Sequence, residues 1–238
     1  MERLSINRET ARGHVFEAND ATEFVAPTLR REGARYRFRS MTQPTPPARP
    51  RIAPLEPPYA PEVEASLRKW MPPGNDAPPL ALFRTLARHP MLSERMRPLG
   101  AGLLAKGELP PRVRELLILR TSARCDARYE WGVHVAAFSA AVGLDGDLVR
   151  RTAVDDADTV RGQDDDDCLV LQVADELHDG SSLSDATFER ARARFGETGV
   201  LEMAAVAGFY HLISFVIRTA RVEDEPWAAV FPAGLTSG

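Results

Sequence analysis

Three residues with acid–base side chains lie near the middle of the chain: Glu115, Glu130 and His134. Glu130 and His134 are four positions apart, so on an α-helix they share a face and can exchange a hydrogen bond. A carboxylate beside an imidazole holds its tautomer and raises its basicity, as a general base requires. Glu115 lies in the preceding apolar stretch, and if the two stretches form antiparallel helices it can pass or store the proton. We therefore predict a proton-transfer site, in which burial would raise the pKa of a glutamate.

The same spacing allows two other interpretations. Glu130 and His134 could form an ordinary surface pair, or His134 could be a buried histidine whose hydrogen bonds are satisfied by a neighbour. They could also bind one metal ion, because Glu and His at positions i and i+4 can reach the same cation. That site would need a third ligand, for which Glu115 or His211 is available, and no second metal motif such as HExxH is present. We predict no metal.

The remaining cysteines and histidines are assigned structural roles. Cys125 and Cys168 are too few for a disulfide framework, so we expect reduced thiols that pack as small buried hydrophobic residues. His211 lies in an apolar run and is expected to be a satisfied core residue. His178 falls near the expected end of a helix, where a histidine interacts favourably with the helix dipole.

Composition and charge exclude several classes of protein. The chain has 238 residues, of which 44% are hydrophobic and 27% charged, with a net charge of −4. These values are typical of a soluble globular domain, and the acidic balance does not favour nucleic acid. Uninterrupted apolar runs are shorter than the roughly 18 residues of a membrane span. The charged N-terminus has no apolar signal-peptide core, so we expect a cytoplasmic protein.

The chain divides into three parts by composition. Residues 1–40 have no sustained hydrophobic period, and we expect a disordered N-terminal extension. Residues 41–60 are rich in proline, which disfavours helix and favours an extended arm. Residues 61–238 carry the helical patterns and form the predicted domain. Its fold class is all-α, because no segment shows the alternation of a half-buried strand.

Helix boundaries in this domain follow from prolines, glycines and capping residues. Asp126 is the expected N-cap of the helix that carries His134, and Gly143 is its expected end. The expected helices cover residues 61–70, 80–90, 91–107, 108–125, 126–143, 145–154, 168–180, 184–196 and 198–222.

The segment RELLILRTSARCDARYEWGVHVAAFSAAVGL (114–144) resembles the carboxymuconolactone decarboxylase family, which shares its helical fold with the AhpD-type alkylhydroperoxidases. The peroxidase branch has a Glu on one helix and CxxCxxxH on the next. Glu115 and His134 match that Glu and His, but Ala127 and Glu130 occupy the two cysteine positions. The dithiol that attacks a peroxide is therefore missing. The resemblance covers roughly residues 60–225 and implies an AhpD-like helical bundle.

The decarboxylase branch resembles ExxxH at this position, and Glu130 with His134 fits it. This resemblance implies cofactor-free decarboxylation of a small carboxylated lactone or related acid. His134, oriented by Glu130, would take or donate the proton beside a carbonyl, while Glu115 shares the charge. Tyrosines would donate to the developing enolate and arginines would hold the substrate carboxylate. The predicted substrate-binding residues are Arg124, Arg128, Tyr129 and Tyr210, with Arg120 as a further arginine that could do so.

The expected partners are a small-molecule substrate and further copies of the chain, since the resemblance implies a homotrimer or homohexamer. Two other functions are kept open. One is a non-catalytic or ligand-binding oligomer that retains the fold, and the other, less supported without the dithiol, is a peroxidase.

Overall fold

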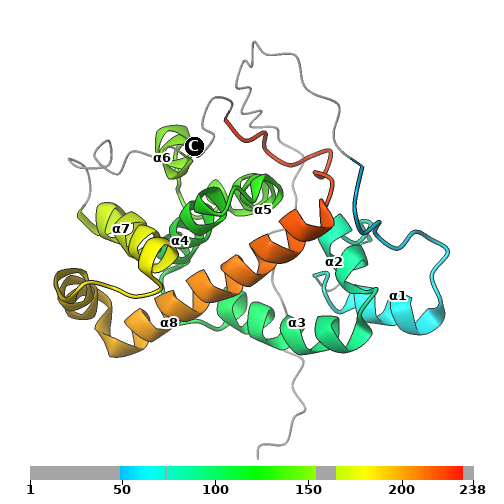
Figure 1. The fold of residues 1–238 in the computed structure, drawn as a ribbon, viewed down its shortest axis with the longest axis horizontal. Coiled ribbons are helices and arrows are strands. Elements are labelled where there is room, and N and C mark those ends of the chain that lie inside the picture. Colours follow the sequence, from blue (N-terminus) through cyan, green and yellow to red (C-terminus); the bar gives the residue numbers. More distant parts are fainter. Residues whose placement is uncertain (1–48, 73, 75, 154–164, 233–238) are drawn as a thin grey trace, which may run out of the picture.

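The computed structural model describes residues 49–72, 74, 76–153 and 165–232, and within these ranges the chain forms helices and no strand. The predicted all-α class is confirmed. The expected extension 1–40 and the first part of the proline-rich arm lie outside the described residues. Figure 1 shows the order and arrangement of the elements. The helices are α1 (Pro61–Arg68), α2 (Ala81–Leu86), α3 (Pro90–Ala105), α4 (Pro111–Arg124), α5 (Arg128–His134), the π-helix η1 (Val135–Ser139), α6 (Gly146–Thr152), α7 (Asp165–Gly180) and α8 (Asp185–Ala220).

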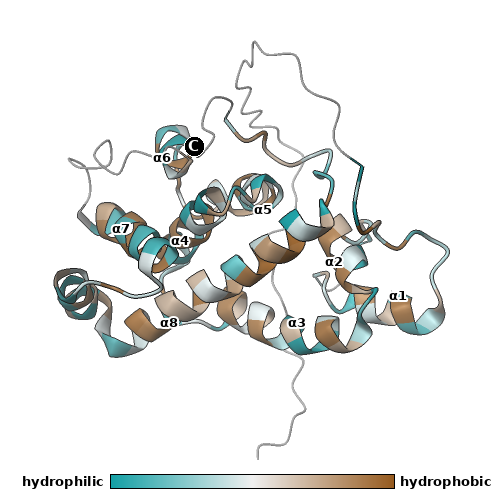
Figure 2. Ribbon diagram, in the orientation of Figure 1, coloured by the Kyte–Doolittle hydropathy of each residue, from teal (hydrophilic) through white to brown (hydrophobic). Residues whose placement is uncertain are grey.

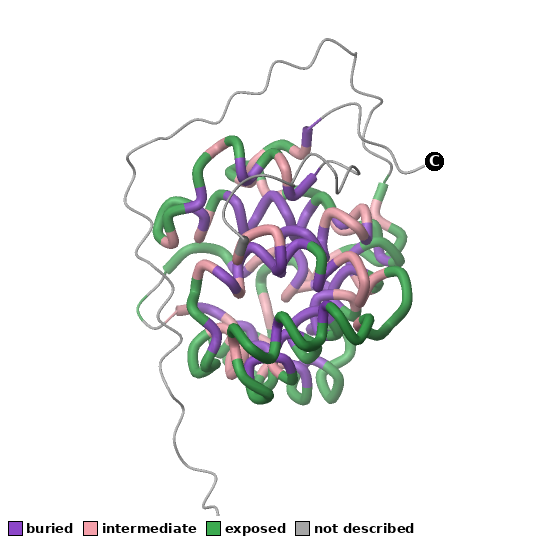
Figure 3. Tube along the Cα trace, turned by 90° about the vertical axis from the view of Figure 1, so that its left-hand side faces the viewer, coloured by how far each residue is buried: buried purple, intermediate pink, exposed green. Residues whose placement is uncertain are grey.

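Helix α4 is the centre of the fold. It packs against α5, α6, α7 and α8, and its four consecutive apolar residues 116–119 are fully buried. Over this run the helix has no solvent face, which explains why four apolar residues follow one another in its sequence. The trace in Figure 3 is mostly buried in its interior and mostly exposed along its periphery. Positions on α4 and on the helices around it are therefore fixed by close packing.

The helix that carries His134 differs from the prediction at its start and in its middle. Asp126 is not the N-cap: its backbone has φ 50°, and the cap is Ala127, without a side-chain hydrogen bond. Asp126 instead pairs with Arg128 and Arg218. Directly after His134 the helix changes to one turn of π-helix, a feature that often occurs beside functional sites. Gly143, with φ 70°, ends this region as predicted.

Helix α8 crosses the whole fold and combines two expected helices. Gly196 has φ 74° and ψ 172°, so it breaks the helix where the sequence predicts an end. By length and composition alone α8 could cross a membrane, but half of its most apolar window is buried in the fold, as in the core helix of a globular domain. In Figure 2 the part of α8 after the kink is mostly brown or pale, with a few teal stretches.

Two non-helical segments pack on the bundle. Residues 49–60 are extended, and the N–H groups of Arg51 and Ile52 donate to the carbonyl of Ala220 at the end of α8. The segment after α8 returns to α5, where the N–H of Ala229 donates to the carbonyl of Gly132 at 3.0 Å. A Cβ on Gly132 would lie 2.4 Å from the carbonyl oxygen of Ala229. The absence of a side chain at Gly132 therefore permits this docking.

Replacing Gly132 with alanine should separate the C-terminal segment from α5. The clash is with backbone, so we expect the free energy of unfolding to fall by about 1–3 kcal/mol, measured by urea denaturation. Gly102 is the matched control, because it lies inside α3 and a Cβ there meets nothing within 4 Å. Gly102→Ala should stabilise by about 0.5–1 kcal/mol. Equal stability of Gly132→Ala and the wild type would contradict this account of the docking.

Candidate functional site: a buried histidine between two glutamates

The structure brings Glu115, Glu130 and His134 together, and we refer to them as the trio. Glu115 comes from α4, and Glu130 and His134 from α5. His134 Nδ1 lies 2.7 Å from Glu115 Oε2, and His134 Nε2 lies 3.4 Å from Glu130 Oε1. The three residues are 1%, 6% and 4% exposed. The interpretation as a surface pair is therefore wrong, because the imidazole is buried and contacts a carboxylate on each side.

The trio holds a proton on His134. Burial lowers the pKa of His134, but the charge and hydrogen bond of Glu115 and those of Glu130 outweigh it and raise the pKa to about 9. At neutral pH the imidazole is thus an imidazolium, with an N–H directed at each carboxylate. His134 can therefore donate a proton in the resting protein, which is one of the two roles that the sequence left open for it.

The arrangement favours proton transfer over metal binding. Glu115 and Glu130 contact opposite nitrogens of one ring, so their carboxylates lie on different sides of His134. Ligands of one cation must instead direct one atom each to a common point. His211, considered as a third ligand, lies in a different cluster with Cys125 and His178. The imidazole of His134 therefore acts as a bridge between two carboxylates.

Three further side chains complete the surroundings of the trio. Arg114 Nη2 lies 3.2 Å from Glu115 Oε1, so Glu115 contacts a cation with each oxygen. The rings of Phe138 and Tyr210 lie 5.0 and 5.2 Å from that of His134, with Tyr210 edge-on at 86°. Tyr210 was predicted, whereas Arg114 and Phe138 were not. Arg114 adjoins Glu115 in sequence, and neighbouring residues on a helix point about 100° apart, so spacing gave no signal for the contact.

Tyr210 keeps its phenolic proton. Burial raises its pKa well above the ordinary value, and the charges of Glu130 and Glu115 raise it further. A protonated phenol next to the trio can donate a hydrogen bond to a developing oxyanion, which is the role the sequence assigned to it.

The hydroxyl of Tyr129 forms its hydrogen bonds away from the trio. It donates to Glu225 Oε1 at 2.8 Å and accepts from the N–H of Leu82 at 3.2 Å. Glu225 Oε1 also accepts from the N–H of Ala81 at the start of α2. Tyr129 therefore connects α5 to α2 and to the C-terminal segment, and it does not contribute its hydroxyl to the trio.

The structure does not bring the predicted arginines to the trio either. Arg128 is half-exposed, pairs with Asp126 and lies over the ring of Phe231. Arg120 is buried and binds Asp175 with two nitrogens, at 2.6 and 2.9 Å. Arg124 lies 3.6 Å from the same carboxylate and 2.6 Å from that of Asp179. Of the arginines considered, none contacts Glu115, and the cation next to the trio is Arg114.

Solved structures with the same helical fold cover most of this chain. An uncharacterized peroxidase-related protein from Silicibacter sp. TM1040 has a TM-score of 0.64 and 18% identity, covering 81% of this chain and 100% of that chain. The debrominase Bmp8, as a cysteine-to-alanine variant in complex with 2,3,4-tribromopyrrole, has a TM-score of 0.59 and 16% identity, covering 74% and 91%. The apo structure of the same debrominase has a TM-score of 0.55 and 14% identity, covering 74% of this chain and 92% of that chain. At these low sequence identities the similarity is one of fold alone, and this fold is the predicted AhpD-like helical bundle.

The sequence itself matches a family over its central part. The model of the carboxymuconolactone decarboxylase family matches residues 90–159, which contain the whole trio. A comparison with curated proteins gives no match. The resemblance to this family is thus supported where the trio lies, and the narrower subgroup without the CxxC pair stays a prediction.

The bridged imidazole predicts how stability depends on pH. A histidine whose pKa is raised on folding from 6.5 to about 9 stabilises the protein fully below pH 6.5, and this contribution is lost as the pH rises through 9. We expect the free energy of unfolding to fall by about 3 kcal/mol over that range, measured by urea denaturation.

His134→Gln should be less stable at neutral pH and should lack this fall, because Gln does not titrate. The exposed His89, replaced in the same way, should retain it. A pH dependence that is the same in His134→Gln and in the wild type would contradict the bridged imidazolium.

Proposed function

We propose that this protein is a cofactor-free decarboxylase of a small carboxylated lactone or related acid, with His134 as the proton donor. The observation that carries the proposal is the buried imidazolium between Glu115 and Glu130. The match of the carboxymuconolactone decarboxylase family to residues 90–159 supports the class of reaction.

Decarboxylation needs a proton at one defined moment. The bond between the carboxylate carbon and its neighbour breaks, carbon dioxide leaves, and the electron pair remains on the neighbouring carbon as an enolate. His134 then gives its proton to that carbon and becomes neutral, and solvent later restores the proton. A donor with a raised pKa keeps its proton until the more basic carbanion forms, so His134 is suited to this step.

Charge balance supports an anionic substrate. Glu115 and Glu130 carry two negative charges, and protonated His134 and Arg114 carry two positive charges, so the four groups are neutral together. During the reaction one negative charge passes from the substrate carboxylate to the enolate. The proton of His134 then neutralises the product and leaves that charge on the trio. Charge moves within the site but does not increase, which limits the cost of desolvation.

Two residues next to the trio, Arg114 and Tyr210, are proposed to bind the substrate. Arg114 has guanidinium donors beside the trio and replaces Arg124 and Arg128 as the residue that would hold the carboxylate. Tyr210, whose phenol stays protonated, would donate to the enolate oxygen. Arg114 and Tyr210 come from α4 and α8, so with His134 of α5 the proposed site lies where these three helices meet.

Turnover of a panel of carboxylated lactones and 3-oxo acids, measured as released carbon dioxide, tests the proposal. We expect His134→Gln to lower kcat by about 100-fold or more and Tyr210→Phe by a smaller factor, since a positioned acid contributes about 10²–10⁴. In deuterium oxide the product should take one deuteron at the carbon that lost the carboxylate.

Arg128→Gln is the control, because Arg128 lies away from the trio, and it should retain wild-type turnover. If no acid in the panel is turned over but one binds, the alternative of a ligand-binding oligomer is favoured. Turnover that survives in His134→Gln would remove His134 from the mechanism.

We further propose that the chain assembles through α8. Exposed apolar residues follow one face of this helix, since positions 11 and 14 apart lie within about 60° of each other. Leu201, Leu212 and Phe215 are 71%, 41% and 60% exposed. Such a stripe is typical of a surface covered by another chain. The family resemblance implies a homotrimer or homohexamer.

Light scattering should give three or six times the chain mass of 26.2 kDa. Phe215→Glu should reduce the mass to that of one chain, because a buried unpaired charge opposes association. Phe188→Glu, at an exposed position of α8 before the kink, should leave the assembly intact. A monomeric wild type would contradict the proposed assembly.

A further inference from the structure

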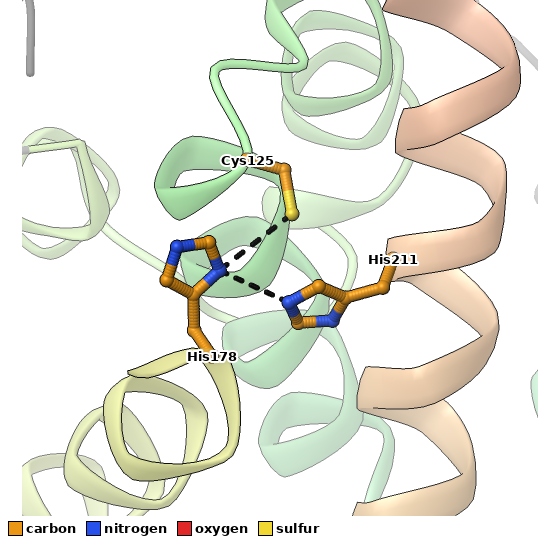
Figure 4. Close-up of side chains that lie close together, drawn as sticks. All are labelled: Cys125, His178 and His211. Atoms are coloured by element: carbon orange, nitrogen blue, oxygen red, sulfur yellow. Dashed lines mark hydrogen bonds between the residues drawn. The ribbon is translucent and has the colours of Figure 1, made fainter. Parts of the chain in front are cut away.

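A second cluster of chemically active side chains lies where α4, α7 and α8 meet (Figure 4). Cys125 is the C-cap of α4, His178 lies in the last turn of α7, and His211 lies within α8. Cys125 Sγ lies 3.8 Å from His178 Nδ1, which lies 3.0 Å from His211 Nε2. The ligand atoms of all three residues lie within 4.8 Å of one another. The sequence assigned each residue a separate structural role.

The hydrogen bonds of His211 determine its tautomer, and therefore which ring nitrogen directs a lone pair into the cluster. Nδ1 lies 2.8 Å from the carbonyl oxygen of Ala207 and must donate, because a carbonyl only accepts. In the neutral ring Nε2 is then an acceptor, directed at His178. A backbone carbonyl that fixes the tautomer of a histidine is the usual support of a metal ligand.

His178 Nδ1 lies near both His211 Nε2 and Cys125 Sγ, but it can form a hydrogen bond with each of them only in a different protonation state. To bond His211, Nδ1 of His178 must carry a proton, and it then has no lone pair for the thiol of Cys125. With its proton moved to Nε2, His178 Nδ1 would offer a lone pair beside those of Cys125 Sγ and His211 Nε2. A cation at this position would satisfy all three atoms at once.

The spacing agrees with tetrahedral zinc coordination. Zn–N bonds of about 2.0–2.1 Å and a Zn–S bond of about 2.3 Å place two nitrogens about 3.3 Å apart and a nitrogen and sulfur about 3.6 Å apart. The corresponding distances here are 3.0 and 3.8 Å. These two distances differ from the ideal values by only a few tenths of an ångström, and the distance between Cys125 Sγ and His211 Nε2 is at most 4.8 Å. Cys125 is buried and the two histidines are half-buried, so the space is reachable from the surface.

The positive charges nearby are paired with carboxylates. Arg124 contacts Asp175 and Asp179, and Arg218 contacts Asp126. Arg218 also donates to the backbone carbonyl of Cys125 at 3.0 Å. These ion pairs offset the repulsion that free guanidinium groups would exert on a cation.

We propose that Cys125, His178 and His211 bind a zinc-type divalent cation through Sγ, Nδ1 and Nε2, with the fourth position open to water or a ligand. On binding, the thiol releases its proton to solvent, and the proton of His178 moves from Nδ1 to Nε2. Three protein ligands and one open position are the coordination of a catalytic zinc site. Cys125 lies ten residues, about 15 Å along α4, from Glu115, so this site is distinct from the trio.

Cobalt(II) is the probe, since it occupies zinc sites and its bond to a thiolate gives a charge-transfer absorption. Titration of the full chain, stripped with a chelator, should give one cobalt per chain with that absorption. One equivalent of zinc should remove it. Cys125→Ser should abolish the absorption, and His178→Gln and His211→Gln should each weaken binding by about 100-fold or more.

Cys168→Ser is the matched control, because it removes the other cysteine and should leave the cobalt spectrum unchanged. Helical circular dichroism shows whether each variant folds, and if Cys125→Ser does not, the two histidine variants decide. Failure of the wild type to bind cobalt stoichiometrically would overturn the proposal. So would a thiolate absorption that survives in Cys125→Ser, or unchanged binding in both histidine variants. The activity of the trio is measured separately, so this proposal can fail while the proposed decarboxylation stands.

Discussion

The structure depends on the fact that its most buried helix carries charge. Glu115 and Arg120 of α4 are each 1% exposed, and an unpaired charge at such depth would cost several kcal/mol. Each therefore needs partners from surrounding helices: His134 of α5 for Glu115, and Asp175 of α7 for Arg120. Arg120 also donates to the carbonyl of Thr152 at the end of α6. Close apolar packing holds these helices against α4, and the paired charges add specific contacts that favour one position along it.

The pair of Arg120 with Asp175 has a structural role, whereas the pair of Glu115 with His134 has a structural role and can also transfer a proton. Arg120 and Asp175 form a two-pronged ion pair that joins α4 to α7 and contains no imidazole. Around Glu115 the charges form a chain, from Arg114 through Glu115 and His134 to Glu130. In a chain of this kind a proton can leave the middle while the two ends remain bound. The difference lies in the imidazole of His134, which can give up its proton and regain it from solvent.

The sequence predicted most of the helices and the contact of Glu130 with His134, because both leave local signals. Pro111 begins α4, Gly196 breaks α8, and the four-residue spacing places Glu130 beside His134. Pro90 was expected to end the helix before it, but it begins α3, and α2 already ends at Leu86. The sequence could not predict contacts that the fold alone creates. Tyr129 bonds a glutamate 96 positions away, and Cys125, His178 and His211 come from three helices. Asp126 was expected as a cap from its residue type, but its partners are two arginines, one of them 92 positions later.

Helix α8 places two neighbouring residues in two different clusters. Tyr210 meets the edge of His134, and the next residue, His211, faces Cys125 and His178. A rotation of α8 about its axis would move both side chains together, because they share one peptide unit. Anything that fixes the azimuth of His211 also fixes how closely Tyr210 approaches the imidazolium. A cation bound as proposed to His211 would thus also hold Tyr210 in place against His134, without any contact between the ligands of the two clusters.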